Sequence, residues 1–80
     1  MQIERFEKPV IKKASEMQPG DVFRTQYGDY CNWGEYVFES CEAYGRNTKI
    51  NVHCDNPNIT SMYDLESIDN VMLEVVGKVL

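Results

Sequence analysis

The chain has 80 residues, of which 42% are hydrophobic and 11% aromatic, and its 13 acidic and 8 basic residues give a net charge of −5. This length allows one domain, residues 1–80, of globular composition, and the lack of a long apolar run excludes a membrane-spanning helix and gives no reason to expect membrane binding. The negative charge repels nucleic-acid phosphates, so it disfavours nucleic acid as a partner and favours a basic protein.

Residues 1–13 are expected to form an N-terminal arm that contains a short edge strand, because Pro9 has no amide donor for a central position in a sheet. The arm mixes charged and apolar residues and lacks the apolar run of a signal peptide, so we expect a cytoplasmic protein. The three cysteines, Cys31, Cys41 and Cys54, are odd in number and widely spaced. They are therefore expected to be reduced thiols.

The first strong structural signal is the pair Pro19-Gly20. Proline presets φ at the first corner of a turn and glycine accepts a positive φ at the second, which predicts a type II turn leading into a strand over residues 21–26. Before this turn, Ser15 is expected to cap a single helical turn, and Met17 is expected to close one end of the core.

Residues 27–34 contain two glycines and three large aromatic side chains, which predicts an aromatic loop. Rigid aromatic side chains beside carboxylates are typical of a protein interface with an acidic rim. The candidate partner-binding residues are therefore Tyr27, Asp29, Tyr30, Trp33, Glu35 and Tyr36. The alternatives are that the aromatic rings fold back to cap the core, and that the interface lies on the acidic segment 64–69.

Residues 35–44 and 49–54 read as two strands of a hairpin joined at Gly45 to Thr48. On the second strand the alternation places Ile50, Val52 and Cys54 on the inward face. The inward face of the first strand depends on whether the turn has two or three residues, which leaves both choices open.

A short strand is expected within residues 59–63, followed by an acidic, turn-like segment over residues 64–70. The last strand covers residues 71–80. Its alternation predicts an inward face made of Val71, Leu73, Val75, Gly77 and Val79. The other face, with Met72, Glu74, Val76, Lys78 and Leu80, is expected to point to solvent because it carries the charges.

Short strands separated by turns, with no long helical pattern, predict an all-β fold. We expect a small, partly open antiparallel barrel of five or six strands, SH3-like as the first choice and OB-like as the alternative. The predicted core consists of Val22, Phe23, Ile50, Val52, Leu73 and Val75.

No catalytic, metal-binding or cofactor-binding residues are predicted. His53 and Cys54 are adjacent on a strand and should point to opposite faces, and no Cys-x-x-Cys spacing is present. Glu39 and Glu42 are more simply explained as part of a solvated acidic face than as an acid and base pair. We therefore expect a protein that is not an enzyme.

Two segments resemble a known group of proteins. Residues 14–23, Ala-Ser-Glu-Met-Gln-Pro-Gly-Asp-Val-Phe, and residues 70–79, Asn-Val-Met-Leu-Glu-Val-Val-Gly-Lys-Val, resemble the two ends of small, mostly uncharacterised phage and prophage proteins with a partly open SH3-like barrel. Both motifs are structural, a turn with its strand and a closing strand, and they cover about a quarter of the chain. The resemblance implies a phage protein in the cytoplasm of its bacterial host and assigns no functional residue.

The functional hypothesis is a non-enzymatic phage accessory protein that binds and inhibits or redirects a basic bacterial host or defence protein, as in host takeover. One alternative is a nucleic-acid-binding small barrel whose aromatic rings stack on bases. Another is an assembly subunit that lends an edge strand to a larger complex, and self-association remains open.

Overall fold

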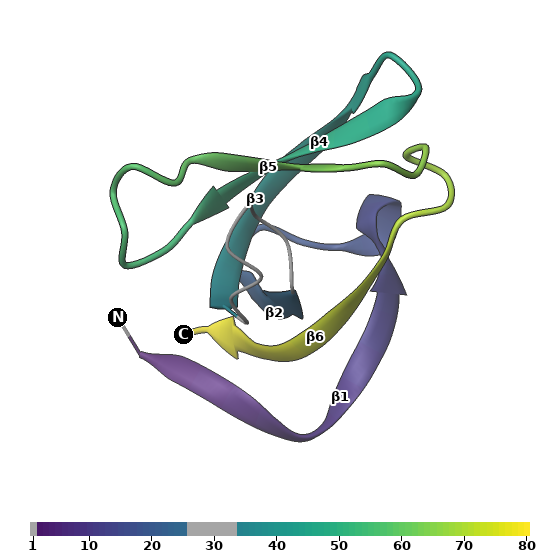
Figure 1. The fold of residues 1–80 in the computed structure, drawn as a ribbon. Helices are drawn as coiled ribbons and strands as arrows, with labels where there is room; N and C mark the ends of the chain where they lie inside the picture. The colour runs from purple at the N-terminus through teal and green to yellow at the C-terminus, as the bar shows by residue number, and fades with distance from the viewer. Residues whose placement is uncertain (1, 26–33) are drawn as a thin grey trace.

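The computed structural model describes residues 2–25 and 34–80 (Figure 1). Its elements in chain order are the strand β1 (Ile3–Lys13), the 3₁₀ turn η1 (Ala14–Glu16), and the strands β2 (Asp21–Thr25), β3 (Gly34–Tyr44), β4 (Asn47–His53), β5 (Ser61–Asp64) and β6 (Met72–Val79). No α-helix occurs in the described ranges, and hence none that could cross a lipid bilayer.

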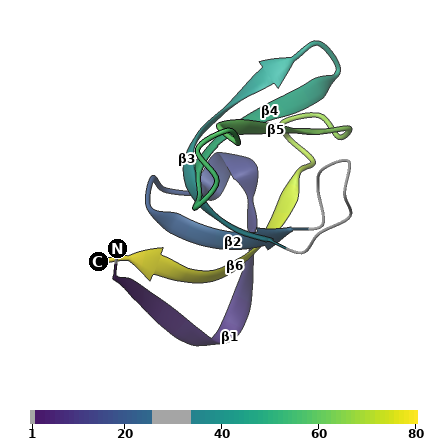
Figure 2. The same ribbon diagram turned by 60° about the vertical axis from the view of Figure 1, so that its left-hand side comes forward.

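All six strands belong to one antiparallel sheet with the order β1-β6-β2-β3-β4-β5. Strands β2 to β5 pair consecutively, while β6 returns to lie between β1 and β2 (Figure 2). The two ends of the chain lie side by side, and the Leu80 N–H donates to the Gln2 carbonyl at 3.0 Å. The predicted all-β class is confirmed. The sheet curls without closing, which is compatible with a small, partly open barrel.

The pairing of the strands is irregular at three places. The register shifts between Arg5 and Val10 on β1, between Val22 and Phe23 on β2, and between Phe38 and Ser40 on β3. Extra residues on one strand of a pair bend it and increase its twist. These irregularities therefore let a single sheet curl around its own inner face.

One cluster of buried side chains fills the inside of the curled sheet. Its members are Ala14, Met17, Phe23, Tyr36, Phe38, Ile50, Val52, Met62, Val71, Leu73 and Val75. The six residues predicted to be buried are all buried, and Phe23, Ile50 and Val75 are fully inaccessible. The Phe23 ring lies against the Tyr36 ring, with 5.9 Å between their centroids.

The Pro19-Gly20 turn has the geometry that the sequence predicts. Gly20 has φ of 97°, and the Asp21 N–H donates to the Gln18 carbonyl at 3.0 Å. The Gly20 N–H also donates to the Phe38 carbonyl, and the Val79 N–H donates to the Gly20 carbonyl. The turn therefore connects β2, β3 and β6 at one end of the barrel.

Near the N-terminus two expectations need correction. The arm is a strand of 11 residues, β1, rather than a short strand behind Pro9. The 3₁₀ turn begins at Ala14 and has no side-chain cap, so Ser15 lies inside the turn instead of capping it. Met17 is buried in the core as expected.

The hairpin turn between β3 and β4 has two residues, Gly45 and Arg46, because Tyr44 pairs directly with Asn47. Gly45 has φ of 62°, which glycine adopts without steric cost. The short turn and the bulge after Phe38 together determine which β3 side chains face inward.

On β6, Val76 is 8% exposed, which contradicts its expected position on the solvent face. Val22 pairs with Gly77 and Phe23 pairs with Val75, so Val76 is left out of the pairing as a bulged residue. A bulge interrupts the alternation of side chains between the two faces. The alternating sequence pattern of β6 does not predict this bulge.

Replacing the central aromatic ring tests the core. Phe23→Ala should lower the free energy of unfolding by ~3–5 kcal/mol, because it leaves a cavity where the side chain is fully buried. Small domains have little more stability than this, so urea titration should show a largely unfolded variant. Met72→Ala, at an exposed position on β6, is the matched control and should change stability little. A Phe23→Ala variant as stable as the control would refute the core assignment.

A second substitution tests the contact between β1 and β6. A Cβ added at Gly77 would lie 2.5 Å from the Glu4 carbonyl oxygen, so Gly77→Ala must displace the β1 backbone. We expect a loss of roughly 1–3 kcal/mol, as for other overpacked sites. Hydrogen exchange should accelerate at Leu80, whose N–H donates to the Gln2 carbonyl beside β1, and stay unchanged at Cys41 and Ile50, which pair across β3 and β4. Unaltered exchange across β1 and β6 would contradict the prediction.

Candidate functional site

The predicted aromatic interface is only partly within the described residues. Tyr27, Asp29, Tyr30 and Trp33 lie outside them, as does Cys31. The two remaining candidates, Glu35 and Tyr36, are at the start of β3.

Tyr36 is a core residue in this fold. It is 9% exposed and its ring packs against Phe23. The chain turns its side chain inward because Phe23 and Tyr36 are directly paired across β2 and β3. Since little of the ring is accessible, we do not include Tyr36 in the interface proposed below.

Glu35 forms an ion pair that the sequence does not reveal. The two terminal guanidinium nitrogens of Arg5, Nη1 and Nη2, each donate to one Glu35 carboxylate oxygen at 2.8 Å. This hydrogen bonding lowers the pKa of Glu35, against a smaller opposing effect of burial, and it raises the pKa of Arg5. Glu35 is therefore not a free carboxylate of an acidic rim, because β1 brings Arg5 beside it.

A second ion pair lies next to the first, and together the two pairs form a row of charges across the sheet. Arg24 pairs with Glu35 across β2 and β3 and with Glu74 across β2 and β6. Its guanidinium donates to both Glu74 oxygens, at 2.9 and 3.4 Å, and this raises the pKa of Arg24. Positive and negative groups alternate along the row, so this part of the surface is not an acidic patch.

The largest exposed aromatic feature of the described residues is on the outer face of β3, β4 and β5. The rings of Tyr44 and Tyr63 are in contact, with 5.1 Å between centroids, and they are 57% and 48% exposed. Leu65 follows β5 directly and is 82% exposed. We name these three residues the Tyr44–Tyr63 surface.

The strand register explains why these side chains point outward. Ile50 faces the core on β4, so its neighbour Lys49 faces outward, and Lys49 pairs with Tyr63 of β5. Tyr44 pairs with Asn47, which lies on the same outer face as Lys49. Alternation thus puts Tyr44 and Tyr63 on one surface, although 19 positions separate them in the sequence.

Two buried polar residues hold the backbone next to Leu65. The Thr48 hydroxyl donates to the Glu66 carbonyl at 3.0 Å, and the Asp64 carboxylate accepts from the Glu66 N–H at 2.8 Å. Both Thr48 and Asp64 are buried. The exposed position of Leu65 is therefore part of a hydrogen-bonded structure.

The candidate list from the sequence did not include Tyr44, Tyr63 or Leu65. Tyr63 immediately precedes the acidic segment 64–69, the alternative interface predicted from the sequence, and Leu65 lies within that segment. A two-residue turn at Gly45 would have identified Tyr44, because it places Tyr44 on the outward face of the hairpin.

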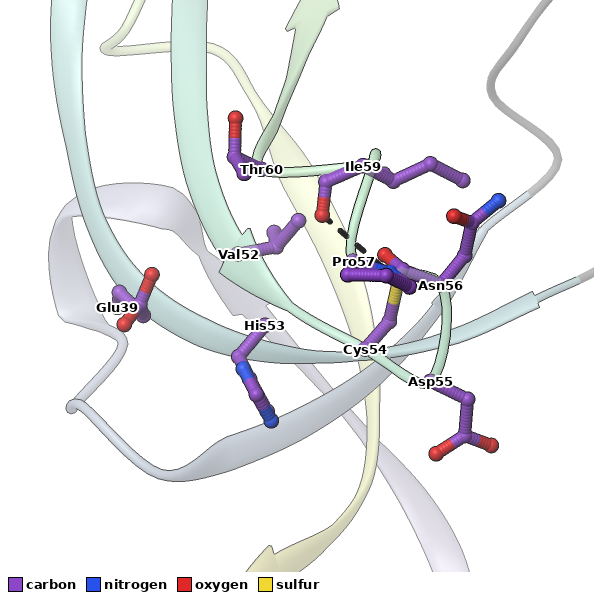
Figure 3. A pocket seen from close by; sticks show the side chains of 9 residues that line it. All are labelled: Glu39, Val52, His53, Cys54, Asp55, Asn56, Pro57, Ile59 and Thr60. Carbon is purple, nitrogen blue, oxygen red and sulfur yellow. Dashed lines mark hydrogen bonds between the residues drawn. The ribbon is translucent and has the colours of Figure 1, made fainter.

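A shallow depression of about 550 Å³ lies at the end of β4 and in the β4–β5 loop (Figure 3). It is lined by Glu39, Val52, His53, Cys54, Asp55, Asn56, Pro57, Ile59 and Thr60. His53 and Cys54 point in different directions (Figure 3). The Cys54 thiol is within hydrogen-bonding distance of the Asn56 carbonyl at 3.4 Å and of the Ile59 carbonyl at 3.8 Å. Within the ranges that the structure covers, no three His, Cys, Asp or Glu side chains are placed to hold a metal ion.

The two described cysteines, Cys41 and Cys54, are free thiols. Burial raises the pKa of the Cys41 thiol, which keeps it protonated at neutral pH. The Cys41 thiol donates a weak hydrogen bond to the Ala14 carbonyl, with 3.7 Å between sulfur and oxygen. Cys41 thus behaves as a partly buried packing residue on β3.

Comparison of the chain with protein-family models, with curated proteins and with solved structures finds no match. The function must therefore be inferred from the surface of the chain itself. Among the described residues, the Tyr44–Tyr63 surface combines exposed apolar area with two aromatic rings held in contact.

The ion pair of Glu35 gives a pH-dependent prediction. Arg5 lowers the folded pKa of Glu35 below its unfolded value, so the stabilisation is complete above the unfolded pKa and is lost as the pH falls through the folded pKa. Glu35→Gln should therefore lower the melting temperature slightly at pH 7, and the difference should vanish at about pH 2. Glu7→Gln, at another exposed carboxylate, is the control. An equal deficit for Glu35→Gln at both pH values would contradict this assignment.

Proposed function

We propose that the protein is a non-enzymatic binding protein that recognises another protein through the Tyr44–Tyr63 surface. In line with the resemblance of its two ends to phage proteins, we assign it as a phage accessory protein that inhibits or redirects a basic bacterial host or defence protein. The negative charge of the chain supports a basic partner, since complementary charge accelerates association.

The observation that carries this proposal is the exposed pair of tyrosine rings. Tyrosine buries a large area on binding and loses few torsional degrees of freedom, which makes it a frequent anchor of protein interfaces. Tyr44 and Tyr63 already hold each other in place, so less order has to be created when a partner binds. Leu65, two residues after Tyr63 in the chain, adds a further exposed apolar side chain.

Substitution of the tyrosines tests the proposal. The tagged chain is used to capture proteins from nuclease-treated bacterial lysate, and the affinity for the captured protein is then measured by calorimetry. Tyr44→Ser and Tyr63→Ser should each weaken binding by at least tenfold, ~1.4 kcal/mol, as expected for aromatic anchors. Met72→Ser, at an exposed apolar position on β6, is the matched control and should bind as the parent does.

Other outcomes separate the rival hypotheses. Equal binding by the parent and both tyrosine variants would refute this surface as the interface. If Trp33→Ala then weakens binding, the aromatic loop is the interface, as the sequence predicts. In a parallel capture from lysate without nuclease, co-purification of nucleic acid without a protein would favour the nucleic-acid alternative.

A further inference from the structure

Strand β5 forms one edge of the sheet and among the described strands it pairs only with β4. An edge strand presents unpaired backbone N–H and C=O groups that can bind another strand. Proteins protect such edges with lysine, proline or bulges. The two edges of this sheet differ in that respect.

The opposite edge, β1, is protected. It carries Pro9 and three lysines, and its pairing with β6 is interrupted between Arg5 and Val10. Strand β5, Ser-Met-Tyr-Asp, has no lysine, no proline and no register shift against β4. Of the two edges, only β5 is left open to an added strand.

The register identifies the backbone groups on this open edge. The Val52 N–H donates to the Thr60 carbonyl at 3.0 Å, which makes Val52 and Thr60 a hydrogen-bonded pair. Hydrogen-bonded and non-bonded pairs alternate along an antiparallel ladder, so the N–H and C=O groups of Ser61 and Tyr63 point away from β4. These groups form a regular set of donors and acceptors over four residues.

The open edge adjoins the Tyr44–Tyr63 surface. The Tyr63 side chain lies on the outer face while its backbone groups point to the edge. A strand added to β5 would therefore place alternate side chains beside the Tyr63 ring and Leu65. Main-chain hydrogen bonds would supply affinity and the aromatic contacts would supply selectivity, as in other cases of strand addition.

The charges around β5 indicate the chemistry of the added segment. No lysine or arginine occurs from residue 50 to residue 77, and the neighbouring cation is Lys49 of β4, which pairs with Tyr63. Exposed Asp55 precedes β5, and exposed Glu66 and Asp69 follow it. The depression in Figure 3 reaches Thr60, immediately before β5, and its charged lining consists of the carboxylates Glu39 and Asp55.

A second copy of the chain fits this edge poorly. Antiparallel pairing of two β5 strands would bring Asp55 of one copy towards Glu66 and Asp69 of the other. Like charges facing each other across strands are destabilising, and each copy carries a net charge of −5. A segment with lysine or arginine at both ends would instead find carboxylates on both sides of β5.

We propose that β5 binds a short, extended, basic segment of a partner protein as a seventh strand of the sheet. This inference rests on the proposed function and specifies how the partner is recognised. The segment pairs with Ser61 and Tyr63 through its backbone, contacts the Tyr44–Tyr63 surface with alternate side chains, and places basic residues near Asp55 and Glu66.

The test is a selection from a displayed library of random twelve-residue peptides, followed by measurements with one enriched peptide. Enriched peptides should have lysine or arginine flanking alternating β-branched or aromatic residues. Amide exchange at Ser61 and Tyr63 should slow at least tenfold on addition of the peptide. N-methylation of the peptide amides that face β5 should weaken binding at least tenfold. An absence of enriched peptides, or binding without this protection, would overturn the inference.

Variants of the chain complete the test. Glu66→Lys should weaken peptide binding at least tenfold, whereas Glu7→Lys, the same charge change on exposed β1, should have a much smaller effect. Ser61→Pro removes an edge donor without removing a bond to β4, and the first position of a strand tolerates proline. If the captured partner is lost with Tyr63→Ser but bound normally by folded Ser61→Pro, strand addition is wrong and the proposed function stands. Normal binding by Tyr63→Ser would refute the proposed function itself.

Discussion

An antiparallel sheet with no helix packed on it must bury one face against itself. The rest of this fold depends on how the described strands bend to bury that face. Most domains cover a sheet with a second layer, whereas here one sheet provides most of the core, and Ala14, Met17 and Val71 are added from segments between its strands. Irregular pairings on three of its strand pairs supply the bends. The Gly20 turn then connects β3 and β6 by backbone hydrogen bonds, which holds one end of the curled sheet together.

The bending also determines the surface. It carries β1 far enough across the sheet for Arg5 to reach Glu35, and Arg24 and Glu74 extend the same row of opposite charges. The carboxylates on that side are therefore compensated. Around β5 the chain has no lysine or arginine from residue 50 to residue 77, and Lys49 of β4 lies opposite Tyr63. The exposed carboxylates Asp55, Glu66 and Asp69 flank β5 in the sequence, near exposed tyrosines and an open edge.

The candidate site could be predicted only in part. Sequence reasoning predicted an aromatic, acidic interface and assigned it to the loop where Tyr27, Tyr30 and Trp33 lie close together in the sequence. Tyr36 shows the weakness of that reasoning, because pairing with Phe23 turns its ring into the core. Tyr44 and Tyr63 are far apart in the sequence and form a surface only after β3, β4 and β5 have paired. Clustering in space depends on register, which composition does not encode.

The sequence by itself determined the local features of this protein: the all-β class, the Pro19-Gly20 turn with its positive φ at glycine, and the inward alternation of Ile50 and Val52. Each of these follows from steric and hydrophobic preferences that act within a few residues. Only the tertiary structure decided the burial of Val76 and the open edge at β5. The reason is that a bulge and an unpaired edge are properties of how strands distant in the sequence fit together, and no single segment contains that information.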